Sequence, residues 1–210
     1  GVQRSSKLSM KLVDRHGKER QRETLNFRKY YGQEKRTVLF YQSPENVKDT
    51  GFLTYDYPDA DKDDDQWLYL PALRKARRIS ASDRGNYFLG TDFTYEDIKK
   101  EGKFELSDYR FKTLKMSSFR EKEVLLLEAI SVNEETAAEL GHSKVLAWVD
   151  TSNWIVLKSQ SWDINQNELK TTVMSDIRKV DGIWTRHSLI VDNHKTGHHT
   201  EFSFSQVDYN

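Results

Sequence analysis

A run of aspartates is the part of the sequence that most resembles a ligand-binding motif. Asp59, Asp61 and Asp63 occupy the first, third and fifth positions of a loop, where an EF-hand calcium site carries oxygen ligands. The sixth position, which needs glycine for its turn, is Asp64, and the twelfth, which needs glutamate, is Leu70. We therefore interpret residues 59–65 as a solvated acidic turn between strands, with a weak cation site as the alternative.

Histidines gather near the end of the chain, where they could serve as metal ligands. His194, His198 and His199 lie close to Glu201, and His187 is on the adjacent predicted strand. A zinc site needs three or four ligands that converge on one point. His198 and His199 are consecutive, so on a strand their side chains point to opposite faces. We predict polar turn residues here, no metal site and no cofactor.

The sequence shows none of the familiar catalytic motifs. It has no cysteine, which excludes a thiol nucleophile, an iron–sulfur site and a disulfide framework. It also has no phosphate-binding glycine loop, no Gly-x-Ser-x-Gly and no His-Glu-x-x-His. An enzyme would require His187 and His194 to converge with acids in a cleft. We therefore predict no catalytic residues and a protein that is not an enzyme.

One dense basic cluster, residues 74–78, stands out from a neutral background. With rings nearby it could stack nucleic-acid bases. The whole chain, however, has 33 basic and 33 acidic residues, without the basic excess of a nucleic-acid binder. We predict that Arg74, Arg77 and Arg78 form a rim that meets anionic head groups or an acidic partner surface, with ordinary surface charge as the alternative.

The elements that must position these residues are mostly strands. Aromatic residues make up 12% of the chain although 31% of it is charged. Apolar and polar residues alternate along most of its length, which is typical of strands with one wet and one apolar face. Asp181-Gly182 between two alternating runs predicts a tight hairpin. We expect about eleven strands in one meander.

Two short helices interrupt the strands. Residues 92–100 form one, with Thr91 or Thr94 as its N-cap, because Thr94 and Asp97 have the spacing of a capping box. Residues 134–140 form the other, between a capping Asn133 and a terminating Gly141. The longest aliphatic run covers only residues 124–127, too few to span a membrane. We expect one domain over residues 1–210.

The rings on the predicted strands allow two interpretations. They form an ordinary core packed by the helices, or they line an apolar cavity on the concave face of a curved sheet. Composition leaves both open. The choice of which rings face inward rests on strand parity, and a slip of one residue inverts it.

A longer motif narrows these alternatives. The segment WLYLPALRKARRIS at residues 67–80 and the segment GTDFTYED at residues 90–97 resemble the LolA-like "outer membrane lipoprotein-sorting protein" branch of the LolA/LolB superfamily. Residues 51–53 and 181–184 also match segments of this branch, and the resemblance covers about residues 7–208. The acidic run at residues 59–65 departs from it. We expect the first helix and the C-terminal tail of the family to lie outside these residues, as would any signal peptide.

The resemblance implies a mainly β (α+β) fold, an incomplete antiparallel β-barrel of about eleven strands with short helices plugging the open side. It also implies a Gram-negative periplasmic carrier that shelters lipid or the acyl chains of lipoproteins, with an inner-membrane RND-type transporter or an outer-membrane acceptor as partner. The alternative is a non-carrier envelope module, for example an accessory to such an exporter. Residues 85–98 would form a lid. The predicted lipid-binding residues are Phe27, Phe40, Trp67, Tyr69, Phe88, Phe93, Trp148 and Trp162.

Overall fold

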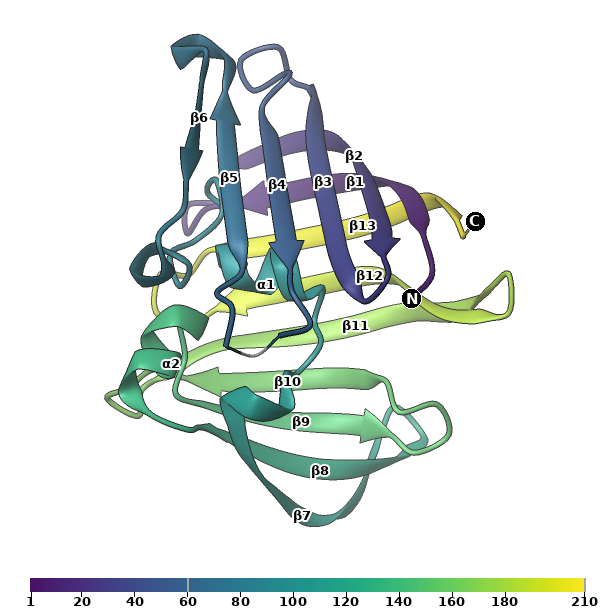
Figure 1. Ribbon diagram of the computed structural model, residues 1–210. Coiled ribbons are helices and arrows are strands. Elements are labelled where there is room, and N and C mark those ends of the chain that lie inside the picture. The colour runs from purple at the N-terminus through teal and green to yellow at the C-terminus, as the bar shows by residue number, and fades with distance from the viewer. Residues whose placement is uncertain (60, 210) are drawn as a thin grey trace.

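The computed structural model describes residues 1–59 and 61–209, and it is built almost entirely from one antiparallel sheet (Figure 1). Within that part of the chain the sheet has thirteen strands, two more than the expected number. The strands are β1 (Arg4–Val13), β2 (Glu19–Tyr31), β3 (Glu34–Ser43), β4 (Gly51–Asp56), β5 (Asp65–Leu70), β6 (Lys75–Arg78), β7 (Tyr109–Phe119), β8 (Lys122–Ser131), β9 (Lys144–Asp150), β10 (Val156–Trp162), β11 (Glu168–Val180), β12 (Ile183–Asn193) and β13 (His199–Asp208).

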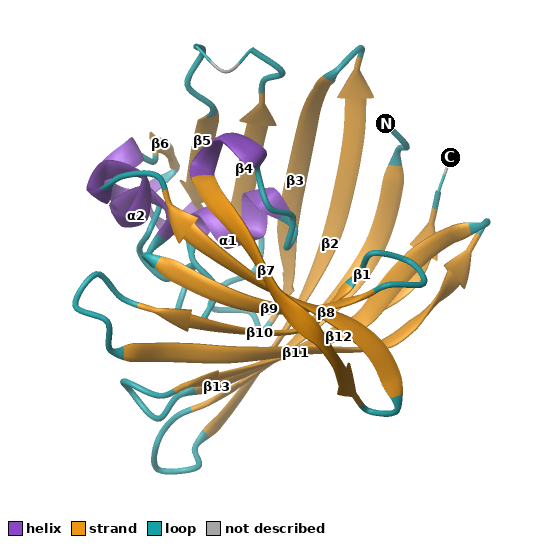
Figure 2. Ribbon diagram, turned by 90° about the horizontal axis from the view of Figure 1, so that it is seen from below, coloured by secondary structure: helices purple, strands orange, loops and turns teal. Residues whose placement is uncertain are grey.

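The strand order corrects the expectation of a single meander. The sheet runs β6-β5-β4-β3-β2-β1-β13-β12-β11-β10-β9-β8-β7, so two meanders meet where β1 pairs with β13. The outer strands β6 and β7 do not pair with each other, and the barrel is therefore incomplete. Figure 2 shows the sheet curled, with the helices on its inner side. A right-handed strand twist accumulated over many strands produces such curvature.

One long connection, residues 79–108, crosses from the β6 edge of the sheet to the β7 edge, and we call it the crossover segment. It contains α1 (Tyr95–Lys100) and the short 3₁₀ turns Ala81–Asp83 and Leu106–Asp108; another 3₁₀ turn, Pro71–Leu73, joins β5 to β6. The predicted cap is confirmed, because Thr94 Oγ1 accepts the Asp97 N–H and the Asp97 carboxylate accepts the Thr94 N–H. This capping box fixes where α1 begins.

The second helix, α2 (Glu134–Leu140), follows β8 and has the predicted bounds. Asn133 caps it, and Gly141 ends it in the left-handed conformation with φ 80°. Gly85 of the crossover segment lies so close to α2 that a Cβ there would be 2.2 Å from the carbonyl oxygen of Ala138. Glycine is therefore required for the crossover segment to pack against α2.

The hydrophobic core lies between the concave face of the sheet and the crossover segment. Phe88, Phe52 and Tyr95 form its aromatic centre, with ring centroids 5.0–5.5 Å apart. Buried aliphatic residues of β1, β3, β5 and β12 surround these rings. Among the described residues no helix is long and apolar enough to cross a membrane.

Candidate ligand-binding cavity

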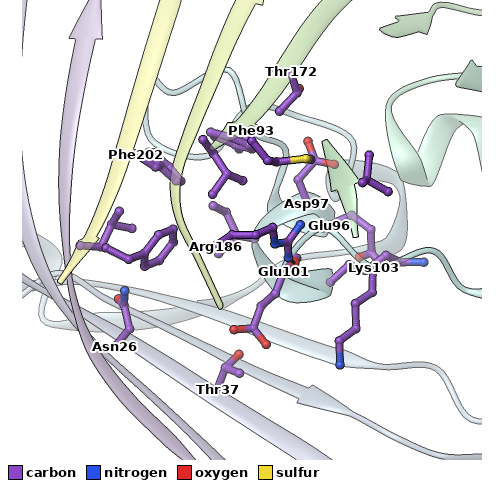
Figure 3. A pocket seen from close by; sticks show the side chains of 18 of the residues that line it. Asn26, Thr37, Phe93, Glu96, Asp97, Glu101, Lys103, Thr172, Arg186 and Phe202 are labelled. Atoms are coloured by element: carbon purple, nitrogen blue, oxygen red, sulfur yellow. Dashed lines mark hydrogen bonds and ion pairs between the residues drawn. The ribbon is translucent and has the colours of Figure 1, made fainter. Parts of the chain in front are cut away.

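A cavity of about 360 Å³ remains between the sheet and the crossover segment. Side chains from β1, β3, β10, β11 and β13 form most of its apolar wall, together with the crossover segment: Leu8, Leu39, Phe93, Val156, Met174 and Phe202. The rings of Phe93 and Phe202 stack at 4.3 Å (Figure 3). The volume is within the range of small-molecule sites. The concave face is therefore neither completely filled nor fully open.

One end of the cavity is charged and is organised around Glu101, which directly follows α1. Arg4 and Arg28 both form ion pairs with the Glu101 carboxylate, Arg28 Nη1 at 3.2 Å from Oε2. Burial acts to raise the pKa of Glu101, but its attraction to Arg4 and Arg28 outweighs burial and lowers that pKa. Arg186 donates to the Glu101 carbonyl oxygen, and Lys103 also borders the cavity. Figure 3 shows Arg186 beside Glu101.

A second polar group tethers α1 to the sheet. Lys170 of β11 is buried, and its Nζ lies 2.8 Å from Asp97 Oδ2 and 2.9 Å from the Asp92 carbonyl oxygen. Burial acts to raise the pKa of Asp97, but the Lys170 charge and hydrogen bond leave it lowered. A partly buried carboxylate with such a buried partner stays ionised, so this ion pair anchors the helix.

His142 borders the cavity as a buried, neutral imidazole. Its Nε2 lies 2.8 Å from the Tyr109 hydroxyl, and burial lowers the pKa of His142 to about 4. The same burial raises the pKa of Tyr109. Within residues 1–59 and 61–209, His142 Nδ1 has no hydrogen-bond partner. Among the described residues that line the cavity, it is the fully buried side-chain atom without a partner.

Residues 85–98, predicted as a lid, are tied down by a buried hydrogen-bond network. The Asp92 carboxylate accepts from Thr200 Oγ1 at 2.7 Å and from Asn193 Nδ2 at 3.1 Å, and it lies 2.5 Å from His198 Nδ1. Phe88 is fully buried. A buried polar network that is satisfied in this way holds its backbone in place. In this structure the segment plugs one end of the concave face, as expected of a closed lid, and its opening stays a prediction.

Of the eight predicted lipid-binding residues, two border the cavity and one is in the core. Phe93 contributes its ring to the wall. Phe27 also borders the cavity, but its side chain is 45% exposed, since its neighbours Asn26 and Arg28 are the side chains directed inward. Phe88 lies in the core, where Phe52 and Tyr95 cover it, and does not border the cavity.

The structure places the other five rings on the outer face of the sheet, which corrects the parity used to predict them. Phe40 and Tyr69 are 42% and 40% exposed and flank Gly51. Their strand neighbours, such as Leu39 and Leu68, carry the inward positions. Successive side chains of a strand alternate between the two faces of the sheet. Because the predicted parity was wrong, all five rings lie on the face opposite to the one expected.

The three tryptophans of that set contact outer-face partners. Trp67 packs edge-on against Tyr55 at 5.1 Å. Lys158 Nζ lies 4.6 Å from the Trp148 ring centroid, and Lys144 Nζ lies 4.2 Å from the Trp162 ring centroid. Each lysine is the cross-strand neighbour of its tryptophan, Lys158 opposite Trp148 and Lys144 opposite Trp162. Cations on the outer face of the sheet thus stabilise Trp148 and Trp162, and an aromatic contact stabilises Trp67.

The basic cluster lies on the outermost strand. Arg77 and Arg78 are exposed on β6, and Arg74 precedes that strand in the left-handed conformation with φ 47°. Arg78 forms an ion pair with Asp65. The cluster therefore lies at a sheet edge, and it does not border the cavity.

The acidic run has a structural role at its C-terminal end that the sequence did not indicate. Asp64 pairs with the buried Lys99 of α1 and accepts the Tyr57 N–H at 2.8 Å. Asp65 accepts a hydrogen bond from the Tyr57 hydroxyl. Residue 60 of this run lies outside the described residues. Among the described residues, no group of three His, Asp or Glu side chains is placed to hold a metal ion.

The C-terminal histidines have separate partners. His194 Nε2 lies 2.7 Å from Thr171 Oγ1, and His187 Nδ1 lies 2.9 Å from the carbonyl oxygen of Asp176. His199 lies between Asp192 and Glu201, and these carboxylates raise its pKa although burial acts to lower it. These rings do not converge with acids in a cleft.

Sequence reasoning missed the charged end of the cavity. Its residues come from β1, β2, β12 and the end of the crossover segment. No local motif joins them, because the pairing of β1 with β2 and β13 brings them together. The one available signal was a series of polar residues at alternate positions of β2, among them Asn26 and Arg28. On an ordinary sheet such a series would indicate the solvent-exposed outer face.

Solved structures with the same fold define the class of this protein as a LolA-like open β-barrel. A structure described as that of an outer membrane lipoprotein-sorting protein domain from Vibrio parahaemolyticus is 28% identical, with a TM-score of 0.88 over 99% of this chain and 85% of that chain. A DUF1329 family protein from Desulfovibrio piger is 25% identical, with a TM-score of 0.89 over the same shares. A LolA superfamily protein from Nitrosomonas europaea, 17% identical over 98% of this chain and 85% of that chain, has the same fold with a TM-score of 0.73.

A family model described as "Uncharacterized protein" matches residues 33–210. The chain belongs to that family, and the expected LolA-like fold is confirmed. No curated protein matches the chain.

Proposed function

We propose that this protein is a periplasmic carrier of the Gram-negative envelope that holds lipid, or the acyl chains of a lipoprotein, in the cavity. The observation that carries the proposal is an apolar hollow left open beneath an otherwise packed crossover segment. The 28% identical structure from Vibrio parahaemolyticus supports it, since that protein is described as a lipoprotein-sorting domain.

The energetics of the cavity favour carriage over catalysis. Each methylene group that leaves water contributes about 0.8 kcal/mol, so a sixteen-carbon chain contributes on the order of ten kcal/mol when it is buried. A carrier needs no nucleophile or general base for this. We infer that the protein acts by binding, and that its function is not enzymatic.

A carrier of this kind also needs partners that load and unload it. An acyl chain enters and leaves such a site only when another protein or membrane receives it. We propose an inner-membrane transporter, of the RND type, or an outer-membrane acceptor in this role. Arg74, Arg77 and Arg78, exposed at the β6 edge, are the residues that we assign to contact with it.

Binding is tested with a fluorescent fatty acid and with native mass spectrometry of the purified protein. We expect a bound lipid, or saturable binding of the fatty acid. Ser159 borders the cavity and Gln160 is its neighbour on β10, directed to the other face. Ser159→Trp fills the cavity and lowers affinity at least about tenfold, whereas Gln160→Trp adds the same ring outside and leaves affinity unchanged.

The opposite result has a defined meaning. If the protein carries no lipid and binds no fatty acid, the carrier function is wrong, and the fold serves as an envelope interaction module. If both tryptophan variants lose affinity equally, the fatty acid binds somewhere other than the cavity.

A further inference from the structure

The charged end of the cavity has more cations than acids can neutralise. Arg4, Arg28, Arg186 and Lys103 all border the cavity there, and Glu101 is the acid among them. Arg4 and Arg28 share the one Glu101 carboxylate. Four cations and one carboxylate leave an excess of three positive charges at this end. The other charged residues of the lining balance one another, since Lys100 pairs with Glu96 and Lys170 with Asp97.

Two of these cations have no carboxylate partner in the described part of the chain. Arg186 donates to a carbonyl oxygen, which satisfies a hydrogen bond but not a charge. Lys103 has no ion pair with any described residue and is exposed at the cavity border. The pKa of Lys103 is lowered, because partial burial and the nearby Lys35 disfavour its charged form. Glu101 and Glu105 offset these effects only in part, so the local field stays positive.

The charged end and the apolar wall belong to the same cavity. Phe93 and Phe202 face one part of it, and Arg186 and Glu101 face another (Figure 3). A purely apolar ligand would leave the cations uncompensated when it displaced water from them, which costs free energy. A guanidinium and an ammonium with free N–H groups instead bind carboxylate or phosphate oxygens.

We propose that this end binds the anionic head group of an amphiphile, a carboxylate or a phosphate, while its acyl chain lies along the apolar wall. The inference rests on the proposed carrier function and deepens it by naming the class of cargo. Arg186 and Lys103 contact the head group, and Arg4 and Arg28, held by Glu101, contribute their field. Neutral and zwitterionic amphiphiles of the same length bind more weakly.

The test is displacement of the neutral probe N-phenyl-1-naphthylamine by submicellar amphiphiles that share one sixteen-carbon chain. Palmitate supplies a carboxylate, palmitoyl lysophosphatidate a phosphate, palmitoyl lysophosphatidylcholine a zwitterion, and monopalmitoylglycerol a neutral head. We expect the better anionic competitor to bind at least about tenfold more tightly than monopalmitoylglycerol. Added salt reduces that difference. The comparison of palmitate with lysophosphatidate shows which anion the site prefers.

A matched pair of variants locates the effect. Lys103→Gln lowers the affinity for the anionic amphiphiles about fivefold and leaves monopalmitoylglycerol unchanged. Lys112→Gln, on an exposed position of β7, is the control and changes neither affinity. Lys103→Glu lowers the excess from three positive charges to one, so it weakens the binding of the anionic amphiphiles further than Lys103→Gln does. Because Lys103 is exposed, these variants retain the fold, which circular dichroism checks.

The outcomes separate this inference from the proposed function. If monopalmitoylglycerol competes as well as the anions, or if Lys103→Gln and Lys112→Gln behave alike, the head-group inference is wrong while the carrier function stands. If no amphiphile displaces the probe and no lipid co-purifies, the carrier function itself is wrong.

Discussion

The two faces of this sheet are both rich in rings, and they use them differently. On the concave face Phe52, Phe88 and Tyr95 are buried and contact one another, next to the cavity. On the outer face Trp148 and Trp162 are half-buried and each is covered by a lysine. The contrast teaches that an excess of aromatic residues does not by itself mark a binding site, because cation–ring contacts allow large rings to remain on a wet surface.

The largest difference between the faces concerns stability. Phe88→Ala removes a fully buried ring at the centre of the core and is expected to lower the free energy of unfolding by about 3–5 kcal/mol. Phe40→Ala on the outer face, where 42% of the residue is exposed, costs less than about 1 kcal/mol. Urea unfolding of both variants checks this. Equal losses would mean that the outer face is covered in solution.

Ion pairs on the two faces provide a second contrast. Lys170→Met leaves the partly buried Asp97 carboxylate without its cation, and we expect a loss of about 3 kcal/mol. The loss is at the low end for such pairs, because Asp97 still accepts the Thr94 N–H. Arg178→Met breaks an exposed pair with Asp176, whose side chains are 59% and 53% exposed, and costs at most about 1 kcal/mol. Thermal or urea unfolding at low ionic strength distinguishes them.

The two faces also predict opposite responses to pH. His142, at the cavity, has a pKa of about 4 when folded and an ordinary value near 6.5 when unfolded. As pH falls, the imidazole is protonated in the unfolded state at a higher pH than in the folded state. Protonation of His142 therefore lowers the free energy of unfolding by about 3 kcal/mol between pH 6.5 and pH 4. His142→Gln flattens this part of the stability curve, which urea unfolding between pH 4 and pH 7 measures. A slope unchanged by the substitution would contradict the buried neutral ring.

His199 on the outer face is the matched control. Its folded pKa is raised, so its contribution is present at low pH and is lost as pH rises through that folded pKa. His199→Gln therefore removes stability on the acid side, the reverse of His142→Gln. Nuclear magnetic resonance titration of the two ring protons measures the pKa values directly, and identical values would remove the contrast.

The smallest expected effect comes from the outer rings themselves. Trp162→Leu keeps an apolar side chain but removes the face that Lys144 covers, and we expect a loss of about 0.5–1 kcal/mol. Lys144→Met in the Trp162→Leu background adds little beyond this, because the partner ring is already absent. A double-mutant cycle measures the coupling, and a coupling of zero would show that the contact contributes nothing.

Local patterns predicted the elements well. Alternation predicted about eleven antiparallel strands, close to the thirteen of the described residues, and the predicted Asp181-Gly182 turn joins β11 to β12. Asn133 and Gly141 bound α2 as expected. These features depend on residues within a few positions of each other, so the sequence alone contains them.

The failures all involve distant residues. The pairing of β1 with β13 joins the two ends of the chain and replaces a single meander by two. That arrangement decides which residues of β3, β5, β9 and β10 face the cavity. The residues on the outer face of these strands include Phe40, Trp67, Tyr69, Trp148 and Trp162. The alternation of apolar residues along a strand does not by itself distinguish an inner sheet face that carries some polar residues from an outer face that carries some aromatic residues.

By itself the sequence determined an antiparallel, mainly β domain with two capped helices, because alternation, turn residues and caps act locally. Its motifs at residues 67–80 and 90–97 also indicated the LolA-like fold. Tertiary structure alone decided which face encloses the cavity, that residues 85–98 plug it, and that Arg4, Arg28, Lys103 and Arg186 meet around Glu101. The physical reason is that curvature and strand order bring together side chains from separate elements, and charge accumulates where they meet.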